Sequence, residues 1–226
     1  MRKELFLFDD FYRSNFGTII GVDEAGRGCI AGPVVAAAVI LLEPLDVYDS
    51  KQLTPSQREA LFEQIQKCAR IGIGVATEEE IDIHNILNAT RIAMNRALEK
   101  LDCPEAFVLV DGKSLKLLQQ GACIVKGDRK SASIAAASIV AKVTRDRMME
   151  KFHEQYPEYD FRVHKGYATK EHLEKLRRYG PTPLHRLTFR PVLEMLNEDL
   201  LTKLVQKDSD RFFAVFRKMH RFVSST

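Results

Sequence analysis

The chain has 226 residues, 45% of them hydrophobic and 29% charged, so it can bury one good core, and a disordered or fibrous protein is not expected. No stretch approaches the roughly 20 apolar residues of a membrane-spanning helix, and Asp9 and Asp10 interrupt the start where a signal peptide would stay apolar. The net charge of +3 combines −3 before Lys165 (21 basic, 24 acidic residues) with +6 from Lys165 onward (13 basic, 7 acidic), which suggests carboxylate chemistry beside an anion-binding surface, although a solvated basic helical face would look the same.

Apolar periodicity and turn residues predict strands interspersed with helices. The predicted elements are a strand, loop and strand from residue 17, a helix over 55–69, a strand over 69–77, a helix over 86–101, strands over 107–110 and 122–125, and helices over 131–152, 169–179, 191–205 and 210–222. The helix start at Pro55 is well marked, because Thr54 and Gln57 form a capping box.

This order of elements predicts an α/β fold, with a mixed β-sheet flanked by helices and a helical extension at the C-terminal end. We expect a catalytic domain over residues 1–192 and the extension over residues 193–226. The four cysteines stand apart without a CxxC pair, so we expect reduced, structural thiols in a cytoplasmic protein. No heptad or apolar stripe indicates an interface, and a monomer is the default expectation.

Four acidic residues stand where the chain leaves the predicted strands, namely Asp23, Glu24, Asp111 and Asp128. Strand ends are where open α/β sheets build sites, and a cluster of like charges is costly unless cations neutralise it. Oxygen ligands without His or Cys select magnesium or manganese, and this composition suits a two-metal phosphoryl-transfer site. Individually, Asp111 could be a turn residue and Asp128 a helix N-cap.

A glycine-rich loop follows the first two carboxylates. Gly26 and Gly28 let backbone amides approach an anion closely, and Arg27 between them adds positive charge. A dinucleotide-binding loop is a poor interpretation, because a strand and not a helix follows this one, and the chain has no GxxxxGK[ST] phosphate-binding loop.

Several segments, in order along the chain, resemble the ribonuclease HII family. They are GVDEAGRGCIAGPVVAAAV from Gly21, DSKQLT from Asp49, NILNATRIAM from Asn85, VDG from Val110, VKGD from Val125, SIAAASIVAKVTRDR from Ser133, HKGYAT from His164 and GPTPLHRLTF from Gly180. The likeness runs from about Thr18 to Val192. Cys29 is a small departure, at a place often taken by proline or a small residue.

This resemblance implies a ribonuclease H-like fold in which Asp23, Glu24, Asp111 and Asp128 are the catalytic, metal-binding residues for two Mg²⁺ or Mn²⁺ ions. It also implies that the loop formed by Gly26, Arg27 and Gly28 contacts the 2′-hydroxyl and neighbouring phosphate of a ribonucleotide. The tyrosine of HKGYAT, Tyr167, is similar to one that senses the same 2′-hydroxyl while its ring stacks on the next deoxyribose, so an RNA-to-DNA junction can be recognised. Tyr167 and His164 could instead be packing residues.

The resemblance further assigns four residues to contacts with the phosphate backbone: Ser50, Lys51, Asn85 and Lys142. Such contacts position a duplex without reading its sequence. The alternatives are a solvated loop lysine at Lys51, a helix cap at Asn85 and a helix surface residue at Lys142.

The activity implied is hydrolysis of the phosphodiester 5′ to ribonucleotides in duplex DNA and in RNA/DNA hybrids, which leaves 3′-hydroxyl and 5′-phosphate ends and removes misincorporated ribonucleotides. The partner would be nucleic acid and not a membrane. Two alternatives remain open: a noncatalytic duplex-binding module, and another nuclease of the same fold that cuts DNA alone. The GRG loop and Tyr167 argue against the second, since reading DNA alone needs neither.

Overall fold

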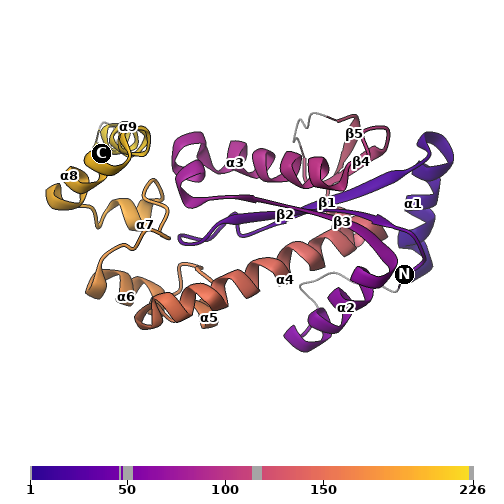
Figure 1. The fold of residues 1–226 in the computed structure, drawn as a ribbon, viewed down its shortest axis with the longest axis horizontal. Helices are drawn as coiled ribbons and strands as arrows, with labels where there is room; N and C mark the ends of the chain where they lie inside the picture. The colour runs from indigo at the N-terminus through magenta and orange to yellow at the C-terminus, as the bar shows by residue number, and fades with distance from the viewer. Residues whose placement is uncertain (1, 46, 48–52, 114–118, 224–226) are drawn as a thin grey trace. The chain divides into compact units, whose positions relative to one another are not determined.

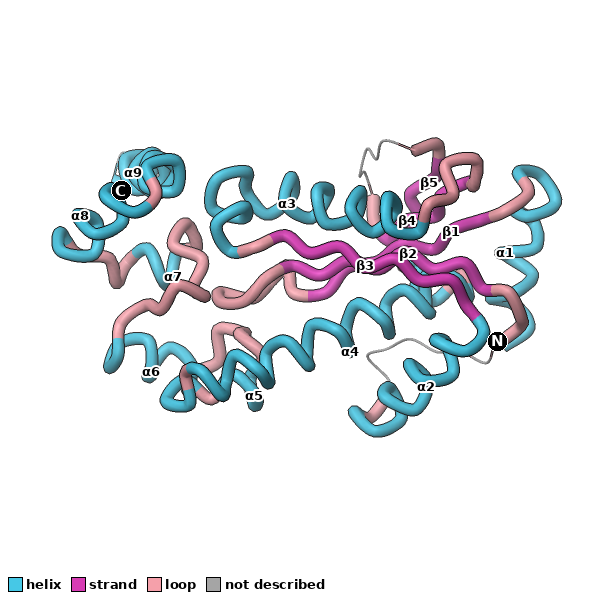
Figure 2. The backbone as a smooth tube through the Cα atoms, in the orientation of Figure 1, coloured by secondary structure: helices cyan, strands magenta, loops and turns pink. Residues whose placement is uncertain are grey.

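The computed structural model describes residues 2–45, 47, 53–113 and 119–223, and it contains a five-stranded sheet (Figure 2). The strands are β1 Ile19–Ala25, β2 Val34–Leu41, β3 Ala69–Ala76, β4 Phe107–Asp111 and β5 Gly121–Ile124. Their order across the sheet is β3-β2-β1-β4-β5. β1 runs antiparallel to β2 but parallel to β4, and β4 runs parallel to β5, so the sheet is mixed as predicted.

Helices precede, separate and follow the strands (Figure 1). They are α1 Arg2–Phe16, α2 Pro55–Cys68, α3 Glu78–Leu101, α4 Ala132–Gln155, α5 Phe161–His164, α6 Lys170–Tyr179, α7 Arg190–Leu193, α8 Glu198–Lys207 and α9 Ser209–Val223, with short 3-10 helices η2 Gly127–Arg129 and η3 Pro157–Tyr159. Where the structure describes the helices, none is long and apolar enough to cross a membrane.

Glycines let two helices approach the sheet closely. A Cβ atom at Gly74 would lie 2.0 Å from the Ala93 carbonyl oxygen of α3, and one at Gly21 would lie 2.1 Å from the Ser133 carbonyl carbon of α4. The small residues of α4 serve the same purpose, because Ala132, Ala135 and Ala136 are fully buried against the sheet core. The Ala- and Ser-rich composition of α4 is therefore a packing feature, as its sequence indicates.

Two compact units divide the chain. The first contains residues 1–25, 34–75 and 90–145, and the second contains residues 26–33, 76–89 and 146–226. Each has its own apolar clusters: Ile19, Leu109 and Ile134 pack in the first, and Leu176, Val192 and Val215 pack in the second. The expected boundary at residue 192 stays a prediction.

Three elements differ from the prediction. Helix α1 was not predicted; it packs Phe8 and Tyr12 against the cluster around Phe107. The single helix expected over 191–205 is wrong, because the chain forms α7 and α8, and Asn197 caps α8 by accepting a hydrogen bond from Leu200 N–H at 3.0 Å. Strand β5 was expected to be buried, yet only Ile124 of its four residues is.

Candidate functional site

The carboxylates of the first unit lie at the ends of adjacent parallel strands. β1 and β4 pair through Val22 and Val110, so Asp23 and Asp111 each follow a paired residue at the same edge of the sheet. Asp111 is the last residue of β4, and Glu24 follows Asp23 before β1 ends at Ala25. β1 and β4 thus carry their carboxylates toward their C-terminal ends, where open α/β sheets build sites.

Asp23 is the most deeply buried of these three carboxylates, with 6% of its surface exposed. Its Oδ1 accepts a hydrogen bond from Glu24 N–H at 2.7 Å. Burial raises the pKa of Asp23 well above its usual value, and the negative charges of Glu24 and Asp111 raise it further, while a hydrogen bond from Ser138 opposes the shift. Glu24 and Asp111 are thus both close enough to repel the Asp23 carboxylate.

Asp128 lies beyond β5, in η2. It is 4% exposed, and the residue before it, Gly127, donates its N–H to Asp111 Oδ1 at 2.6 Å. Ile134 N–H in the first turn of α4 donates to Ser131 Oγ, so a serine supplies that cap. The hydrogen bond to Gly127 connects the segment that carries Asp128 to the Asp111 carboxylate.

The donor chemistry of these residues fits a divalent cation. Asp23, Glu24, Asp111 and Asp128 can provide hard oxygen ligands, and the repulsion of Asp23 by Glu24 and Asp111 gives a negative field, which suits Mg²⁺ or Mn²⁺. Among the described residues, however, no group of three or more His, Cys, Asp or Glu side chains is gathered closely enough to form a ligand cage. The structure brings Asp23, Glu24 and Asp111 into electrostatic contact without closing such a cage around an ion.

In the second unit, the glycine loop contacts the segment that contains Tyr167. Gly26 is buried, whereas Arg27 and Gly28 are exposed. Further along the loop, Ile30 N–H and Ala31 N–H both donate to the Gly166 carbonyl oxygen, at 2.9 and 3.3 Å. Hydrogen bonds therefore hold the loop beside the residue that precedes Tyr167.

Tyr167 is 45% exposed, and hydrogen bonds to its carbonyl oxygen fix its backbone. Its carbonyl oxygen accepts hydrogen bonds from Thr169 N–H at 2.8 Å and from His172 Nδ1 at 2.8 Å. The preceding Gly166 has φ +84°, and a Cβ atom there would lie 2.3 Å from the Ala31 carbonyl oxygen. Only glycine meets both conditions without strain.

Three buried histidines pack together next to the backbone of the Tyr167 segment. The rings of His164 and His172 stack at 4.1 Å between centroids, and Nε2 of His172 lies 3.1 Å from Nε2 of His185. Burial lowers the pKa of His164, that of His172 to about 4, and that of His185 to about 3. All three rings are thus neutral at pH 7, and the interpretation of His164 as a packing residue is confirmed.

The structure describes two of the four remaining residues predicted to contact substrate. Asn85 interrupts α3 with φ 67°, and its Oδ1 accepts hydrogen bonds from Leu87 N–H at 3.1 Å and Asn88 N–H at 3.2 Å, so it acts as a helix cap. Lys142 is half-buried on α4. Ser50 and Lys51 lie outside the described residues.

The sequence interpretation assigned no role to Arg186, His172 or His185. All three are fully buried: Arg186 donates to the loop, His172 contacts the Tyr167 carbonyl oxygen, and His185 contacts His172. His185 and Arg186 lie in the GPTPLHRLTF segment, where an arginine among apolar residues was the available signal.

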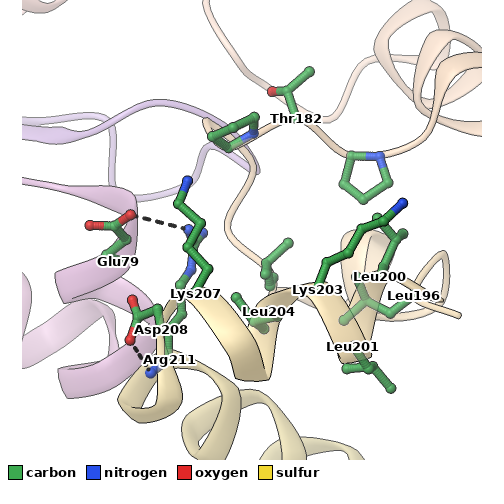
Figure 3. A pocket seen from close by; sticks show the side chains of 13 residues that line it. Glu79, Thr182, Leu196, Leu200, Leu201, Lys203, Leu204, Lys207, Asp208 and Arg211 are labelled. Carbon is green, nitrogen blue, oxygen red and sulfur yellow. Dashed lines mark hydrogen bonds and ion pairs between the residues drawn. The ribbon is translucent and has the colours of Figure 1, made fainter. Parts of the chain in front are cut away.

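A separate pocket of about 230 Å³ lies in the second unit, between α8 and residues 181–183 (Figure 3). Leucines of α8 and of the turn before it line one side, and Arg211 forms an ion pair with Glu79 at 3.7 Å. None of the residues predicted for the site lines this pocket.

Comparison with known proteins identifies relatives of this chain. The family model for ribonuclease HII matches residues 20–192. Ribonuclease HII of Pseudothermotoga lettingae is 61% identical over 221 residues, which cover 97% of this chain and 99% of that protein.

Solved structures share the fold. Ribonuclease H2 from Pyrococcus horikoshii OT3 matches with a TM-score of 0.64 at 28% identity, over 79% of this chain and 96% of that one. Bst-RNase HIII in complex with Mn²⁺ matches with a TM-score of 0.65 at 20% identity, over 79% of this chain and 68% of that one, which shows the fold alone. The family model and the close relative establish that this chain belongs to the ribonuclease HII family and is a ribonuclease H, a nuclease that acts on RNA paired with DNA.

Proposed function

We propose that the chain hydrolyses the phosphodiester bond 5′ to a ribonucleotide, both in duplex DNA with embedded ribonucleotides and in RNA/DNA hybrids. The products would carry 3′-hydroxyl and 5′-phosphate ends, and the cellular role would be removal of misincorporated ribonucleotides. The observation that carries this proposal is buried Asp23, held at a strand end beside Glu24 and Asp111. Carboxylates collected in this way are costly to folding and are typical of phosphoryl-transfer sites.

The catalytic residues would be Asp23, Glu24, Asp111 and Asp128. When bound by these four carboxylates, two Mg²⁺ or Mn²⁺ ions would supply positive charge and Lewis acidity for phosphodiester hydrolysis. The protein contributes position: Glu24 N–H fixes the Asp23 carboxylate, and Gly127 N–H fixes that of Asp111. A protein of the same fold, Bst-RNase HIII, was solved with Mn²⁺, which supports a divalent cation here.

Recognition of the ribonucleotide would come from Gly26, Arg27, Gly28 and Tyr167. Exposed Arg27 and Gly28 would offer backbone amides and positive charge, and half-exposed Tyr167 would offer its hydroxyl and ring. The 2′-hydroxyl would act as a recognition element and not as the nucleophile.

The rest of the duplex would be held through its phosphates by a second set of residues. We assign this role to Ser50, Lys51, Asn85 and Lys142, and to the extension over residues 193–226, where exposed Arg217 and Lys218 of α9 provide positive charge. We take a monomer acting on cellular DNA in the cytoplasm as the working form.

The test is cleavage of a labelled duplex with one internal ribonucleotide, beside an all-DNA duplex and an RNA/DNA hybrid, with Mg²⁺, with Mn²⁺ and with chelator. We expect metal-dependent cutting 5′ to the lone ribonucleotide, cutting of the hybrid, and an intact all-DNA duplex. Cutting of the hybrid alone would move the activity toward that of ribonuclease HIII and remove the role of Tyr167. Binding of the duplex without any cutting would leave a noncatalytic module.

A further inference from the structure

Arg186 holds the glycine loop from inside the second unit. Its buried guanidinium donates from Nη2 to the Gly26 carbonyl oxygen at 2.7 Å and from Nη1 to that of Arg27 at 3.1 Å. Nε and Nη2 also donate to the Gly32 carbonyl oxygen, at 2.9 and 2.7 Å, and the guanidinium lies over the Phe189 ring at 5.1 Å. One side chain thus binds the loop at its beginning and at its end.

These contacts determine where the loop amides point. In a trans peptide the carbonyl and the following N–H point in opposite directions. Because the carbonyls of Gly26 and Arg27 point toward Arg186, the N–H groups of Arg27 and Gly28 point away from it. Both of these residues are exposed, and their two successive amide donors lie on the side of the loop away from Arg186, an arrangement that suits a hydroxyl or phosphate oxygen.

His185, the neighbour of Arg186, reaches Tyr167 through a second ring. Thr182 N–H donates to His185 Nδ1 at 3.0 Å, so the ring proton of His185 sits on Nε2 and is donated to His172 Nε2 at 3.1 Å. His172 therefore carries its proton on Nδ1 and donates it to the Tyr167 carbonyl oxygen at 2.8 Å. The donor at Thr182 therefore fixes the direction of both hydrogen bonds that follow, from His185 to His172 and from His172 to Tyr167.

Backbone hydrogen bonds also join residues 185–186 to the glycine loop and the loop to the Tyr167 segment. Arg186 N–H donates to the Ile30 carbonyl oxygen at 2.9 Å, and His185 pairs with Ala31 in a β-bridge. Ile30 N–H in turn donates to the Gly166 carbonyl oxygen at 2.9 Å. A shift of residues 185–186 would therefore displace both the loop and the Tyr167 segment.

We infer that His172 and Arg186 are positioning residues for ribonucleotide recognition: Arg186 aims the amides of the glycine loop, and His172, whose tautomer is fixed by His185, sets the backbone of Tyr167. This inference rests on the proposed recognition of the 2′-hydroxyl by the loop and Tyr167. Neither side chain needs to touch the substrate, since each acts through the backbone of a residue that does.

The experiment measures KM and kcat on the single-ribonucleotide duplex, and Ki of the all-DNA duplex as a competitive inhibitor. The ratio Ki/KM reports discrimination for the ribonucleotide, whereas phosphate contacts affect both constants alike. The first variant is R186K, which keeps the positive charge but loses the planar guanidinium with its several N–H donors. The second is H172L, which removes the hydrogen-bond donor to the Tyr167 carbonyl. H172N is the conservative variant, because an asparagine amide can still donate from the place of Nδ1.

We expect R186K and H172L each to lower Ki/KM about tenfold, the equivalent of one or two lost hydrogen bonds, mainly through KM. H172N should recover much of the ratio. V215A is the matched control, because Val215 is fully buried in the same unit and its truncation loosens the core without removing a polar contact.

The inference is overturned if Ki/KM is unchanged in R186K. If R186K does not fold, an unchanged Ki/KM in H172L overturns it instead. So does an equal fall of the ratio in V215A, which would mean that any loosening of the unit has this effect. Failure of the proposed function has a different signature: the unsubstituted protein itself would not cut the ribonucleotide duplex, or would cut all-DNA duplex equally well.

Discussion

At Asp23 the requirements of folding and of chemistry conflict. The carboxylate is buried, and Glu24 and Asp111 add negative charge, so the folded chain binds a proton there more readily than the unfolded chain does. At pH values above the raised pKa, an ionised Asp23 thus costs folding free energy unless a cation neutralises it. The hydrogen bond from Glu24 N–H offsets only part of that cost.

The substitution Asp23→Asn should therefore separate activity from stability. We expect a loss of cleavage rate of at least about 100-fold, because charge stabilisation at such a site amounts to several kcal/mol. In chelator, the melting temperature should rise by roughly 2–4 °C, as for about 1 kcal/mol in a chain of this size. Calorimetry and the duplex cleavage assay measure the two effects.

Asp9→Asn is the matched control for this experiment. Asp9 is also a buried carboxylate with a pKa raised by burial, but its Oδ2 accepts hydrogen bonds from Ser133 N–H and Oγ on α4. Its loss should leave the catalytic rate within about twofold, the scatter expected for a substitution outside a site. A D23N protein that retained full activity, or lost it only as much as D9N, would contradict the assignment of Asp23.

Gly166 should be intolerant of even one added methyl group. Gly166→Ala would place Cβ 2.3 Å from the Ala31 carbonyl oxygen and keep an unfavourable φ of +84°, so the loop or Tyr167 must shift. A displacement of about 1 Å at a substrate-positioning element can lower kcat/KM by up to about 100-fold. Gly180→Ala has a similar φ of +76° with no atom within 4 Å of its Cβ, so it should show the backbone strain alone. Equal activity losses in the two variants would argue against the close approach at Gly166.

At the scale of elements, the break in α3 depends on Asn85. Its φ of 67° is costly for most residues, and its Oδ1 caps the second half of the helix. Asn85→Ala should lower the free energy of unfolding by about 1–2 kcal/mol, whereas Asn85→Gly should cost only a few tenths, because glycine accepts both the cap position and the positive φ. Urea unfolding of the two variants measures the difference.

The same pair tests the proposed phosphate contact of Asn85. Both variants lack the side-chain amide, so a contact with substrate predicts that KM rises in N85G as much as in N85A. A normal KM in N85G, with reduced stability in N85A, would leave Asn85 with a structural role only.

Which elements could be predicted depends on how local their causes are. The start of α2 was predicted because Thr54 and Gln57 form its capping box within one turn. Helix α1 was missed because its packing is nonlocal: Asp9 reaches Ser133, 124 residues away. The break between α7 and α8 had a local signal in Asn197, a preferred N-cap residue, but leucines on both sides suggested a continuous helix.

The candidate site also has parts with local sequence signals and parts that depend on contacts distant in sequence. Carboxylates at strand ends could be inferred from apolar runs that stop at Asp111 or just before Asp128, and the family motifs pointed to the same residues. The role of Arg186 in holding the glycine loop could not be inferred, because its contacts with Gly26 and Arg27 span about 160 residues. A sequence pattern shows that an arginine lies in an apolar segment, but only the fold shows which carbonyls it binds.

For the whole molecule, the buried histidines should make stability depend on pH. Burial lowers the pKa of His172 to about 4 and that of His185 to about 3, whereas both titrate near 6.5 in the unfolded chain. Between these values the two histidines bind protons in the unfolded chain but not in the folded chain, so their contribution lowers stability as the pH falls below about 6.5. Each histidine contributes up to about 1.4 kcal/mol per pH unit over this range.

The carboxylates with raised pKa act in the opposite direction, because Asp23 and Glu78 take up protons earlier in the folded chain than in the unfolded one. A single pH profile would mix both effects, so the prediction is made for a difference. Replacing His172 by asparagine removes one group that titrates only in the unfolded chain, and the slope of unfolding free energy between pH 6 and 4.5 should become shallower by about 1.4 kcal/mol per pH unit. H84N, at an exposed histidine, is the control and should follow the parent. Parallel profiles for the parent and H172N would mean that His172 accepts a proton in the folded protein as readily as in the unfolded chain, and the hydrogen-bond chain from Thr182 to Tyr167 could then not hold the tautomers assigned to it.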